Sequence, residues 1–416
     1  MLRKSGNRII IGYDLADTSS QISYCYIKED ASVETVASVA GTEIYDIPTV
    51  LCKRVGVNQW LFGKEAMRFV QDNPDEGILV DGLVQKALSG EMVPVEDEEY
   101  HPIALLTLFM KRSLGMLSEV ASLSQIASIM ITTYQMDGGM TDVLNKVGEK
   151  LGLKDVPVHF QSYTESFYYY MLYQPKELWA YQTLLLDYRT KDICAYKMEC
   201  NKRTTPIVVY IHRKEHAFDK SDEGLVRIAK EYCTEQVISS VYLIGEGFQG
   251  DWMEESLRYL CRGRRVFQGN NLYSKGAALS MLEKFLGDED AKEYIYLGND
   301  KLKANIGMKL LQGGETVYLA MLDAGNHWYD SGFEGDVYLK GDNTLEITVT
   351  PLQGSGERVL PVTLDGISLE PEQMTRVRLR LYMISEEVLC LEAEDLGFGW
   401  LAEGSGTVFR KEMTIY

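Results

Sequence analysis

The sequence lacks the features on which several common functions depend. Its 42 Lys and Arg residues are outnumbered by 61 Asp and Glu residues, and the formal net charge is −19. This balance argues against a broad basic surface for nucleic acid or an anionic membrane. The apolar stretch Ile103–Met110 is far too short to cross a bilayer, and no signal-peptide pattern precedes the first predicted strand. The sequence therefore predicts a cytoplasmic protein with neither a nucleic-acid nor a membrane partner.

Recognisable cysteine and histidine motifs are also scarce. The seven cysteines are scattered and never form a C-x-x-C pair, which disfavours a disulfide framework or a zinc knuckle and fits reduced thiols. His212 and His216 are four residues apart, but no third ligand accompanies them. We therefore expect surface histidines at these positions and not a zinc site.

With 416 residues, the chain is long enough for two or more domains. Helix and strand patterns alternate up to about residue 290, whereas apolar and polar residues alternate strictly in later segments such as Val377–Met383. The acidic segment Asp288–Asp290 marks a predicted linker between these regions. We expect an α/β domain over residues 5–290 and an all-β sandwich over residues 300–416.

One stretch near the start of the chain carries the strongest chemical signal. The β-branched run Ile9–Ile11 predicts a buried strand, and small residues after Asp14 predict a tight turn into a returning strand, Ile22–Tyr26. A turn of this kind can offer backbone N–H groups to a phosphate, and an aspartate at the strand end can orient a hydrated magnesium ion.

A similar arrangement recurs in the second part of the α/β region. The apolar strand Thr183–Asp187 also ends in an aspartate and is followed by a turn and a returning strand, Ile193–Lys197, which indicates an internal duplication. Further on, Gly245–Gly250 fits the pattern G-x-G-x-x-G between a strand and a helix. A dinucleotide site would need an acidic residue near Val266–Gly269, and none is present there.

An aromatic helix is predicted over Ser162–Tyr173. It carries more aromatic side chains than one buried stripe can hold. Two interpretations stay open: the helix contributes to the core and to a wall between domains, or it presents a face to a protein partner.

Taken in order, these motifs resemble those of the DnaK-type heat-shock chaperones, which belong to the actin-like ATPase superfamily. Ile11–Leu15 with Thr18 is similar to the first phosphate motif, Leu185–Asp187 to the second, and Val241–Gly247 to the adenosine motif. The other similar segments are Pro48-Thr49, Phe62-Gly63 with Ala66, Ile131–Leu153, Lys275–Ala278, Asp342-Asn343, Gln353-Gly354 with Glu357, Leu364–Ile367 and Leu391–Asp395. The resemblance implies a duplicated, ribonuclease-H-like ATPase domain followed by a β-sandwich substrate-binding domain.

The resemblance also implies a site. Asp14 and Asp187 would be the catalytic residues, and Asp14 would hold Mg²⁺ through water. The cofactors would be ATP and Mg²⁺. The residues implied to bind nucleotide are Gly12, Asp14, Thr18, Ser19, Gly245 and Gly247.

Several departures from the family pattern weaken this site. Ala16 and Asp17 replace a glycine and a threonine in the first turn, and Asp17 adds a negative charge where a phosphate would lie. The second turn, Tyr188–Asp192, has no glycine, although its Arg189 or Lys191 could bind phosphate by charge. The segment after Asp187 is too short for the family's extra subdomain, so we expect a reduced second lobe. The β domain ends the chain, so we also expect the helical lid to be absent.

The sequence therefore predicts a degenerate, chaperone-like protein with weak or lost nucleotide binding. It would act as a protein- or peptide-binding scaffold through the β-sandwich and the Ser162–Tyr173 helix. The alternative is an active Mg-ATP-dependent chaperone that couples hydrolysis to peptide capture. A sugar- or acetate-kinase relative is disfavoured by the sandwich. If the first interpretation holds, replacing Asp14 should change little.

Overall fold

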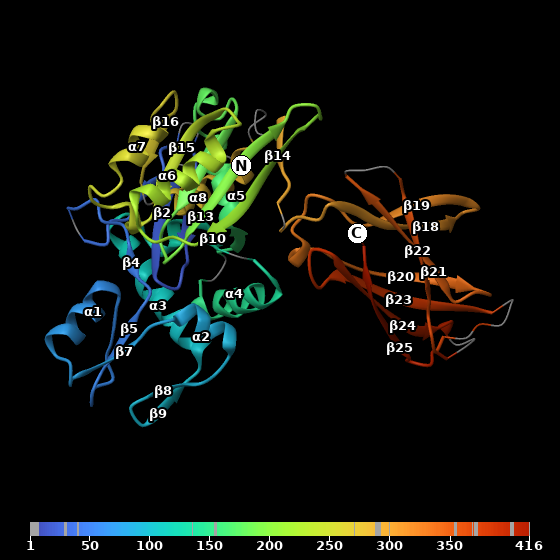
Figure 1. Cartoon of the computed structure of the whole chain (residues 1–416). Helices are drawn as coiled ribbons and strands as arrows, with labels where there is room; N and C mark the ends of the chain where they lie inside the picture. Colours follow the sequence, from blue (N-terminus) through green and yellow to red (C-terminus); the bar gives the residue numbers. More distant parts are fainter. Residues whose placement is uncertain are drawn as a thin grey trace. The chain divides into compact units, whose positions relative to one another are not determined.

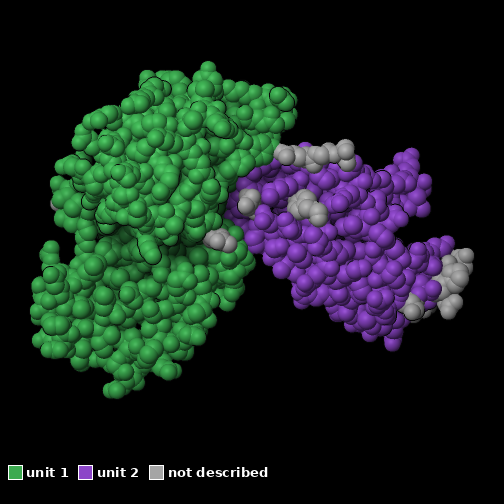
Figure 2. All heavy atoms as spheres, viewed as in Figure 1, with its two compact units in different colours: residues 1–296 green, residues 297–416 purple. Residues whose placement is uncertain are grey.

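The computed structural model describes residues 8–28, 31–39, 41–134, 136–153, 156–269, 271–287, 293–298, 300–352, 356–367, 369, 373–399 and 403–415 (Figure 1). The chain divides into two compact units, residues 1–296 and 297–416 (Figure 2). Unit 1 mixes helices with sheets and unit 2 consists mainly of strands, so the predicted class of an α/β region followed by a β region is confirmed at this level. The predicted linker Asp288–Asp290 and the Gln353-Gly354 motif lie outside the described residues.

The first sheet of unit 1 is built around the isoleucine run. Its strand order is β11-β10-β1-β2-β3, with β4 (Ile47–Pro48) also paired to β2. Strand β1 runs antiparallel to β2 and parallel to β10, which lies between β1 and β11. All six residues of β1 are buried, as expected for a strand covered on both faces. The main strands are β1 (Ile9–Asp14), β2 (Ser19–Tyr26), β3 (Glu34–Thr35), β10 (Ile126–Thr133) and β11 (Val158–Ser162).

The second sheet repeats this topology. Its order is β16-β15-β12-β13-β14-β17, and β12 runs antiparallel to β13 and parallel to β15. Apart from the edge strand β17 here and the off-path strand β4 in the first sheet, strand order and directions are the same, so the two Asp-ended units noted in the sequence lie in sheets of like topology. The strands are β12 (Gln182–Asp187), β13 (Ile193–Asn201), β14 (Ile207–His216), β15 (Ile238–Ile244), β16 (Arg265–Gln268) and β17 (Tyr294–Tyr296).

Two helices cross between the sheets. Helix α5 (Tyr163–Leu172) follows the first sheet but packs its aromatic residues against β12, β13 and β15 of the second sheet. Helix α8 (Leu272–Leu286) follows the second sheet but packs against β1 and β10 of the first sheet. A Cβ atom at Gly276 would lie 1.9 Å from Ser166 O, so this glycine lets α8 approach α5 closely. Because each helix packs against the sheet that it does not follow, the first turns of α5 and α8 lie next to each other.

Other helices cover the remaining faces or form a peripheral lobe. Helices α6 and α7 pack on the face of the second sheet opposite α5. A three-stranded sheet of β5, β6 and β7 lies beside α1. The remaining elements of unit 1 are β5 (Leu51–Arg54), β6 (Trp60–Phe62), α1 (Gly63–Asp72), β7 (Gly77–Val80), α2 (Leu83–Ser89), β8 (Val93–Val95), β9 (Glu98–Tyr100), α3 (Pro102–Leu114), α4 (Gly138–Leu151), α6 (Asp222–Cys233) and α7 (Glu254–Leu260).

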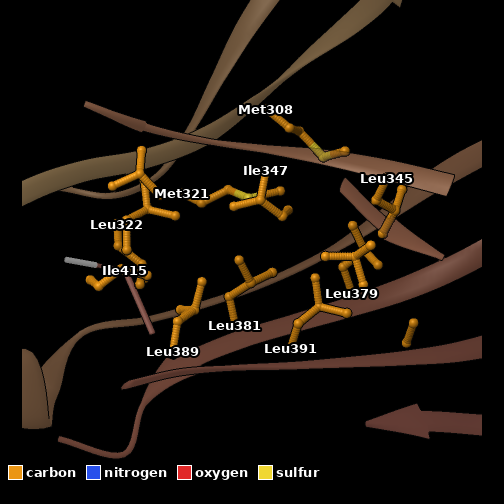
Figure 3. Close-up of a cluster of buried hydrophobic side chains, with 14 of the residues drawn as sticks. Met308, Met321, Leu322, Leu345, Ile347, Leu379, Leu381, Leu389, Leu391 and Ile415 are labelled. Atoms are coloured by element: carbon orange, nitrogen blue, oxygen red, sulfur yellow. The ribbon is translucent and has the colours of Figure 1, made fainter. Parts of the chain in front are cut away.

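Unit 2 contains two four-stranded sheets, with orders β19-β18-β21-β22 and β20-β23-β24-β25. Alternate side chains such as Ile347, Leu381 and Leu391 fill a common apolar core (Figure 3), because successive strand residues point to opposite faces. The strands are β18 (Ala304–Gln312), β19 (Glu315–Leu322), β20 (Gly332–Lys340), β21 (Thr344–Pro351), β22 (Arg358–Thr363), β23 (Met374–Met383), β24 (Val388–Gly397) and β25 (Val408–Thr414).

Two further observations concern the chain as a whole. All seven cysteines are free thiols, in agreement with the scattered sequence pattern. Among the helices within the described ranges, none has both the length and the apolar character needed to cross a membrane.

Candidate functional site

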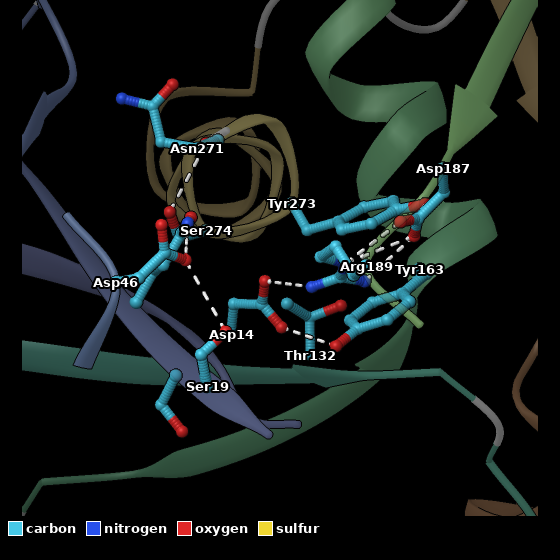
Figure 4. A network of polar contacts seen from close by, with 12 residues as sticks. Asp14, Ser19, Asp46, Thr132, Tyr163, Asp187, Arg189, Asn271, Tyr273 and Ser274 are labelled. Atoms are coloured by element: carbon cyan, nitrogen blue, oxygen red, sulfur yellow. Dashed lines mark hydrogen bonds and ion pairs between the residues drawn. The ribbon is translucent and has the colours of Figure 1, made fainter. Parts of the chain in front are cut away.

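Two aspartates lie at equivalent positions of the two sheets in unit 1. Asp14 ends β1 and pairs in register with Thr132 of β10, whereas Asp187 ends β12 and pairs with Ile244 of β15. Both aspartates are buried. The matching topology brings the two predicted catalytic residues into one polar network (Figure 4).

Arg189 joins these two carboxylates. Its Nη1 donates to Asp14 Oδ2 at 2.9 Å, and its Nη2 and Nε donate to Asp187 Oδ2 at 3.0 Å and Oδ1 at 3.1 Å. The side chain of Arg189 is 13% exposed, and those of Asp14 and Asp187 are 1% and 7% exposed. The rigid guanidinium fork suits such a two-sided contact. A cation of the chain itself therefore compensates both acidic groups.

Two tyrosines from the crossing helices complete the network. Tyr163 begins α5 and donates its hydroxyl to Asp14 Oδ1 at 2.5 Å, and Tyr273 of α8 donates to Asp187 Oδ2 at 3.1 Å. Their rings stack with centroids 4.0 Å apart. Arg189 Cζ lies 4.6 Å from the centroid of the Tyr163 ring and 4.7 Å from that of Tyr273, within the range of cation–π attraction.

The protonation of the network follows from burial and these contacts. Burial raises the pKa of Asp14 to about 6, and this rise is opposed by Arg189 and the Tyr163 hydroxyl. Burial lowers the pKa of Arg189, but the neighbouring Asp187, Tyr163 and Asp14 outweigh it and raise that pKa well above its usual value. Burial also raises the pKa of Tyr163 and Tyr273 well above the usual value. Both phenols therefore stay protonated and act as donors.

The glycines predicted to bind nucleotide permit close packing of protein segments. A Cβ atom at Gly12 would lie 2.0 Å from Ser274 O of α8, and one at Gly247 would lie 2.1 Å from the ring of Tyr188. Gly245 has a φ of +106°, and a Cβ there would meet the Tyr188 backbone at 2.5 Å. Side chains and backbone of the chain itself therefore fill the space that these three glycines leave.

Residues of the turn between β1 and β2 have two different surroundings: some line a cavity and one contacts α2. Thr18 and Ser19 line a cavity beside Arg189, and Ser19 Oγ lies 3.4 Å from Asp46 Oδ1. Asp17 turns away to α2, where its Oδ1 accepts from the backbone N–H groups of Val84 at 2.9 Å and Gln85 at 3.3 Å. This carboxylate therefore stabilises the first turn of α2.

Arg189 borders two cavities of unit 1. One, of about 500 Å³, is lined by the β1–β2 turn, by one face of α1 and by the start of the Gly245 turn. The other, of about 550 Å³, is strongly acidic, and Asp17, Asp137 and Asp192 are among its lining residues. Asp137 caps α4 by accepting from Met140 N at 2.9 Å, so at least two of these carboxylates stabilise helix starts.

The contacts of Arg189, Tyr163 and Tyr273 were not predicted from the sequence. Arg189 was predicted only as a possible phosphate ligand, although its position two residues after Asp187 placed it near the strand end. Tyr163 falls within the predicted aromatic helix Ser162–Tyr173 but was not singled out. The side chains of Tyr163, Phe167 and Tyr168 are buried in the core of unit 1. This burial agrees with the core interpretation of that helix. The partner-binding interpretation stays a prediction.

The histidine pair has separate partners. His212 Nε2 lies 2.9 Å from Glu199 Oε1, and His216 Nε2 lies 2.7 Å from the Tyr232 hydroxyl. The His212 side chain is 57% exposed, as expected for a surface histidine. The His216 side chain is only 10% exposed, so the expectation of a surface position is wrong there, because this imidazole packs against Tyr232.

Unit 1 is a mixed α/β unit in which two sheets of like strand order each end a strand in an aspartate, and Arg189 pairs with both aspartates. Residues 32–299 match the family described as "Family of unknown function (DUF5716) C-terminal", and because this is more than half of the chain, the chain belongs to that family. Residues 301–415 match "Domain of unknown function (DUF8552)". The first match includes Asp187, Arg189 and both network tyrosines, whereas Asp14 precedes it. A search of the curated proteins gave no match.

Proposed function

We propose that unit 1 is an actin-like fold of the DnaK type whose phosphate cleft is closed by Arg189, and that the protein acts as a binding scaffold without hydrolysing ATP. Two features support the fold assignment: the strand order repeated in both sheets and the aspartate that ends β1 and β12. The exchange of α5 and α8 between the sheets supports it as well.

The main support for a lack of ATP hydrolysis is the contact of Arg189 with the carboxylates of both Asp14 and Asp187. Residues that fit a magnesium ion would need free carboxylate oxygens or space for its water ligands. Asp14 instead accepts from Arg189 with one oxygen and from Tyr163 with the other. A metal ion would also face the guanidinium charge. These residues therefore do not fit Mg-ATP.

The edges of the unit 2 sheets support a binding role. The edge strands β19, β22, β20 and β25 carry one exposed large apolar side chain each. These side chains are Tyr318, Val359, Tyr338 and Val408. An edge strand also has backbone groups that can pair with an extended peptide. We propose that unit 2 binds an extended segment of a partner protein by adding it to such an edge.

The first test is thermal unfolding of the full chain with and without millimolar Mg-ATP, together with phosphate release. Binding at a hundredfold excess over Kd would stabilise the chain by about 2.7 kcal/mol, and we expect neither this shift nor phosphate release. A clear shift and release that are both lost in Asp14→Asn would refute the proposal in favour of an active ATPase.

Peptide binding is tested separately by fluorescence anisotropy with a labelled, extended apolar peptide. We expect saturable binding, and a charge introduced by Val408→Lys or Tyr338→Lys should weaken it if that edge is used. Lys411→Arg keeps the charge of β25 and is the matched control. Absence of saturable binding would refute peptide capture by unit 2.

A further inference from the structure

We propose that the 500 Å³ cavity beside Arg189 binds a small organic monophosphate without a metal ion. This inference rests on the proposed function in one respect, namely that the cavity does not hold Mg-ATP. The cavity is formed by Thr18 and Ser19 of the first turn, Lys64 and Arg68 of α1, and Arg189. Its volume lies within the usual range for small-ligand sites, about 300 to 1,000 Å³.

Two cationic side chains on α1 would attract the phosphate group of the ligand. Lys64 and Arg68 are four residues apart, so they lie on the same face of the helix, and both line the cavity. Neither has an ion-pair partner within the described parts of the chain. Like charges at this spacing destabilise a helix, and a bound dianion would remove that repulsion. Unpaired cations in a concave site are notable in a chain with a net charge of −19.

Polar groups in the same cavity match the rest of such a ligand. Gln21 is 1% exposed and donates from Nε2 to Asp46 Oδ1 at 2.8 Å. Its Oε1 is buried and has no hydrogen-bond partner in the described structure. Because that oxygen is enclosed by protein atoms, a ligand hydroxyl or amine would reach it only after a small rotation of the Gln21 side chain, and this contact would relieve the cost of an unsatisfied buried acceptor. The hydroxyls of Thr18 and Ser19 can donate to phosphate oxygens.

Two carboxylates set the limit on ligand charge. Asp46 is engaged by Gln21, whereas Glu246 is exposed and lines the cavity beside Gly245. Arg189 is already compensated by Asp14 and Asp187. Lys64 and Arg68 together can neutralise one phosphate dianion but not a triphosphate, and Glu246 would repel further negative charge. Glu246 can instead accept from a sugar hydroxyl. The chemistry therefore favours a hydroxyl-bearing monophosphate.

The test is isothermal titration of the full chain with glucose 6-phosphate in EDTA, with inorganic phosphate and glucose as comparison ligands. We expect saturable binding of the sugar phosphate, weaker binding of phosphate and none of glucose. Lys64→Ala and Arg68→Ala should each weaken binding about tenfold, as loss of one charge-assisted contact does. Glu246→Gln should tighten binding because it removes a repelling charge.

Lys146→Ala is the control, because Lys146 is an exposed cation on α4 that pairs with Asp142. It should leave binding unchanged. No binding in EDTA, or equal binding in wild type, Lys64→Ala and Arg68→Ala, would overturn the inference. Metal-dependent ATP binding lost in Asp14→Asn would instead overturn the proposed function, so the two failures are distinguishable.

Discussion

Replacing Arg189 by methionine tests whether one side chain links the two sheets of unit 1. The substitution keeps a long apolar stem but removes the charge that pairs with Asp14 and Asp187, which are 1% and 7% exposed. Removing one partner of a buried ion pair costs about 3 to 5 kcal/mol, because the remaining charge is buried without compensation. Protonation of Asp14 would limit this cost. We therefore expect a loss of about 3 kcal/mol in the free energy of unfolding at pH 7.

The pH dependence of this loss identifies its cause. Burial already raises the pKa of Asp14 to about 6 while Arg189 opposes the rise, so removing Arg189 should raise that pKa further. At pH 5 the variant would then hold Asp14 neutral, and the difference from wild type should shrink. Urea unfolding of wild type and variant at pH 5 and pH 7 measures this difference in the free energy of unfolding. Added Mg²⁺ should also stabilise the variant more than the wild type, because the freed carboxylates can bind a cation.

Arg258→Met is the matched control for this substitution. Arg258 forms an exposed i,i+4 pair with Glu254 on α7, and such pairs contribute less than about 1 kcal/mol. If Arg189→Met and Arg258→Met lost the same free energy, or if the Arg189 variant were as stable as wild type at pH 7, the argument for a buried ion pair would be wrong.

Two further predictions concern the same region. The raised pKa of Asp14 means that the native state binds a proton more tightly than the unfolded chain, so stability should fall by up to about 3 kcal/mol as pH rises from about 4 to 6. Asp14→Asn should flatten this pH dependence in urea unfolding. An unchanged profile would contradict the assignment of the pH dependence to Asp14. For stability, this prediction replaces the sequence-based expectation that a change at Asp14 has little effect. Gly12→Ala should cost about 3 kcal/mol or more because its Cβ would meet Ser274 O at 2.0 Å. Gly115→Ala, which meets nothing within 4 Å, should stay within about 1 kcal/mol, and equal thermal shifts for the two would refute the packing argument.

Local patterns in the sequence were sufficient to predict the framework of the site. The apolar runs before Asp14 and Asp187 predicted β1 and β12, because a strand buried on both faces needs an uninterrupted run of such residues. The repeat of strand, aspartate, turn and returning strand predicted the duplication of the sheets. Both predictions depend on neighbouring residues alone. The structure confirms the strands β1 and β12, and the two sheets have the same strand order.

The role of the glycines could not be predicted in the same way. A glycine that cradles a phosphate and a glycine that admits another protein segment both lack a Cβ for the same steric reason. At Gly12 the neighbour is α8, which begins about 260 residues later in the chain. At Gly247 the neighbour is Tyr188. Only the tertiary structure distinguishes these uses, since each depends on a segment distant in sequence.

Arg189 contacts charged and aromatic groups from both sheets of unit 1, so its interactions also hold the two sheets together. Asp14 ends a strand of the first sheet and Tyr163 begins the helix after that sheet, whereas Asp187 ends a strand of the second sheet and Tyr273 lies in the helix that follows that sheet. Arg189 contacts all four side chains. Separating the two sheets would therefore break a buried ion pair and expose two stacked rings. The network therefore favours the one arrangement of the two sheets in which all these contacts are made. A monophosphate bound by Lys64 and Arg68 would occupy the cavity beside that network without needing to displace Arg189.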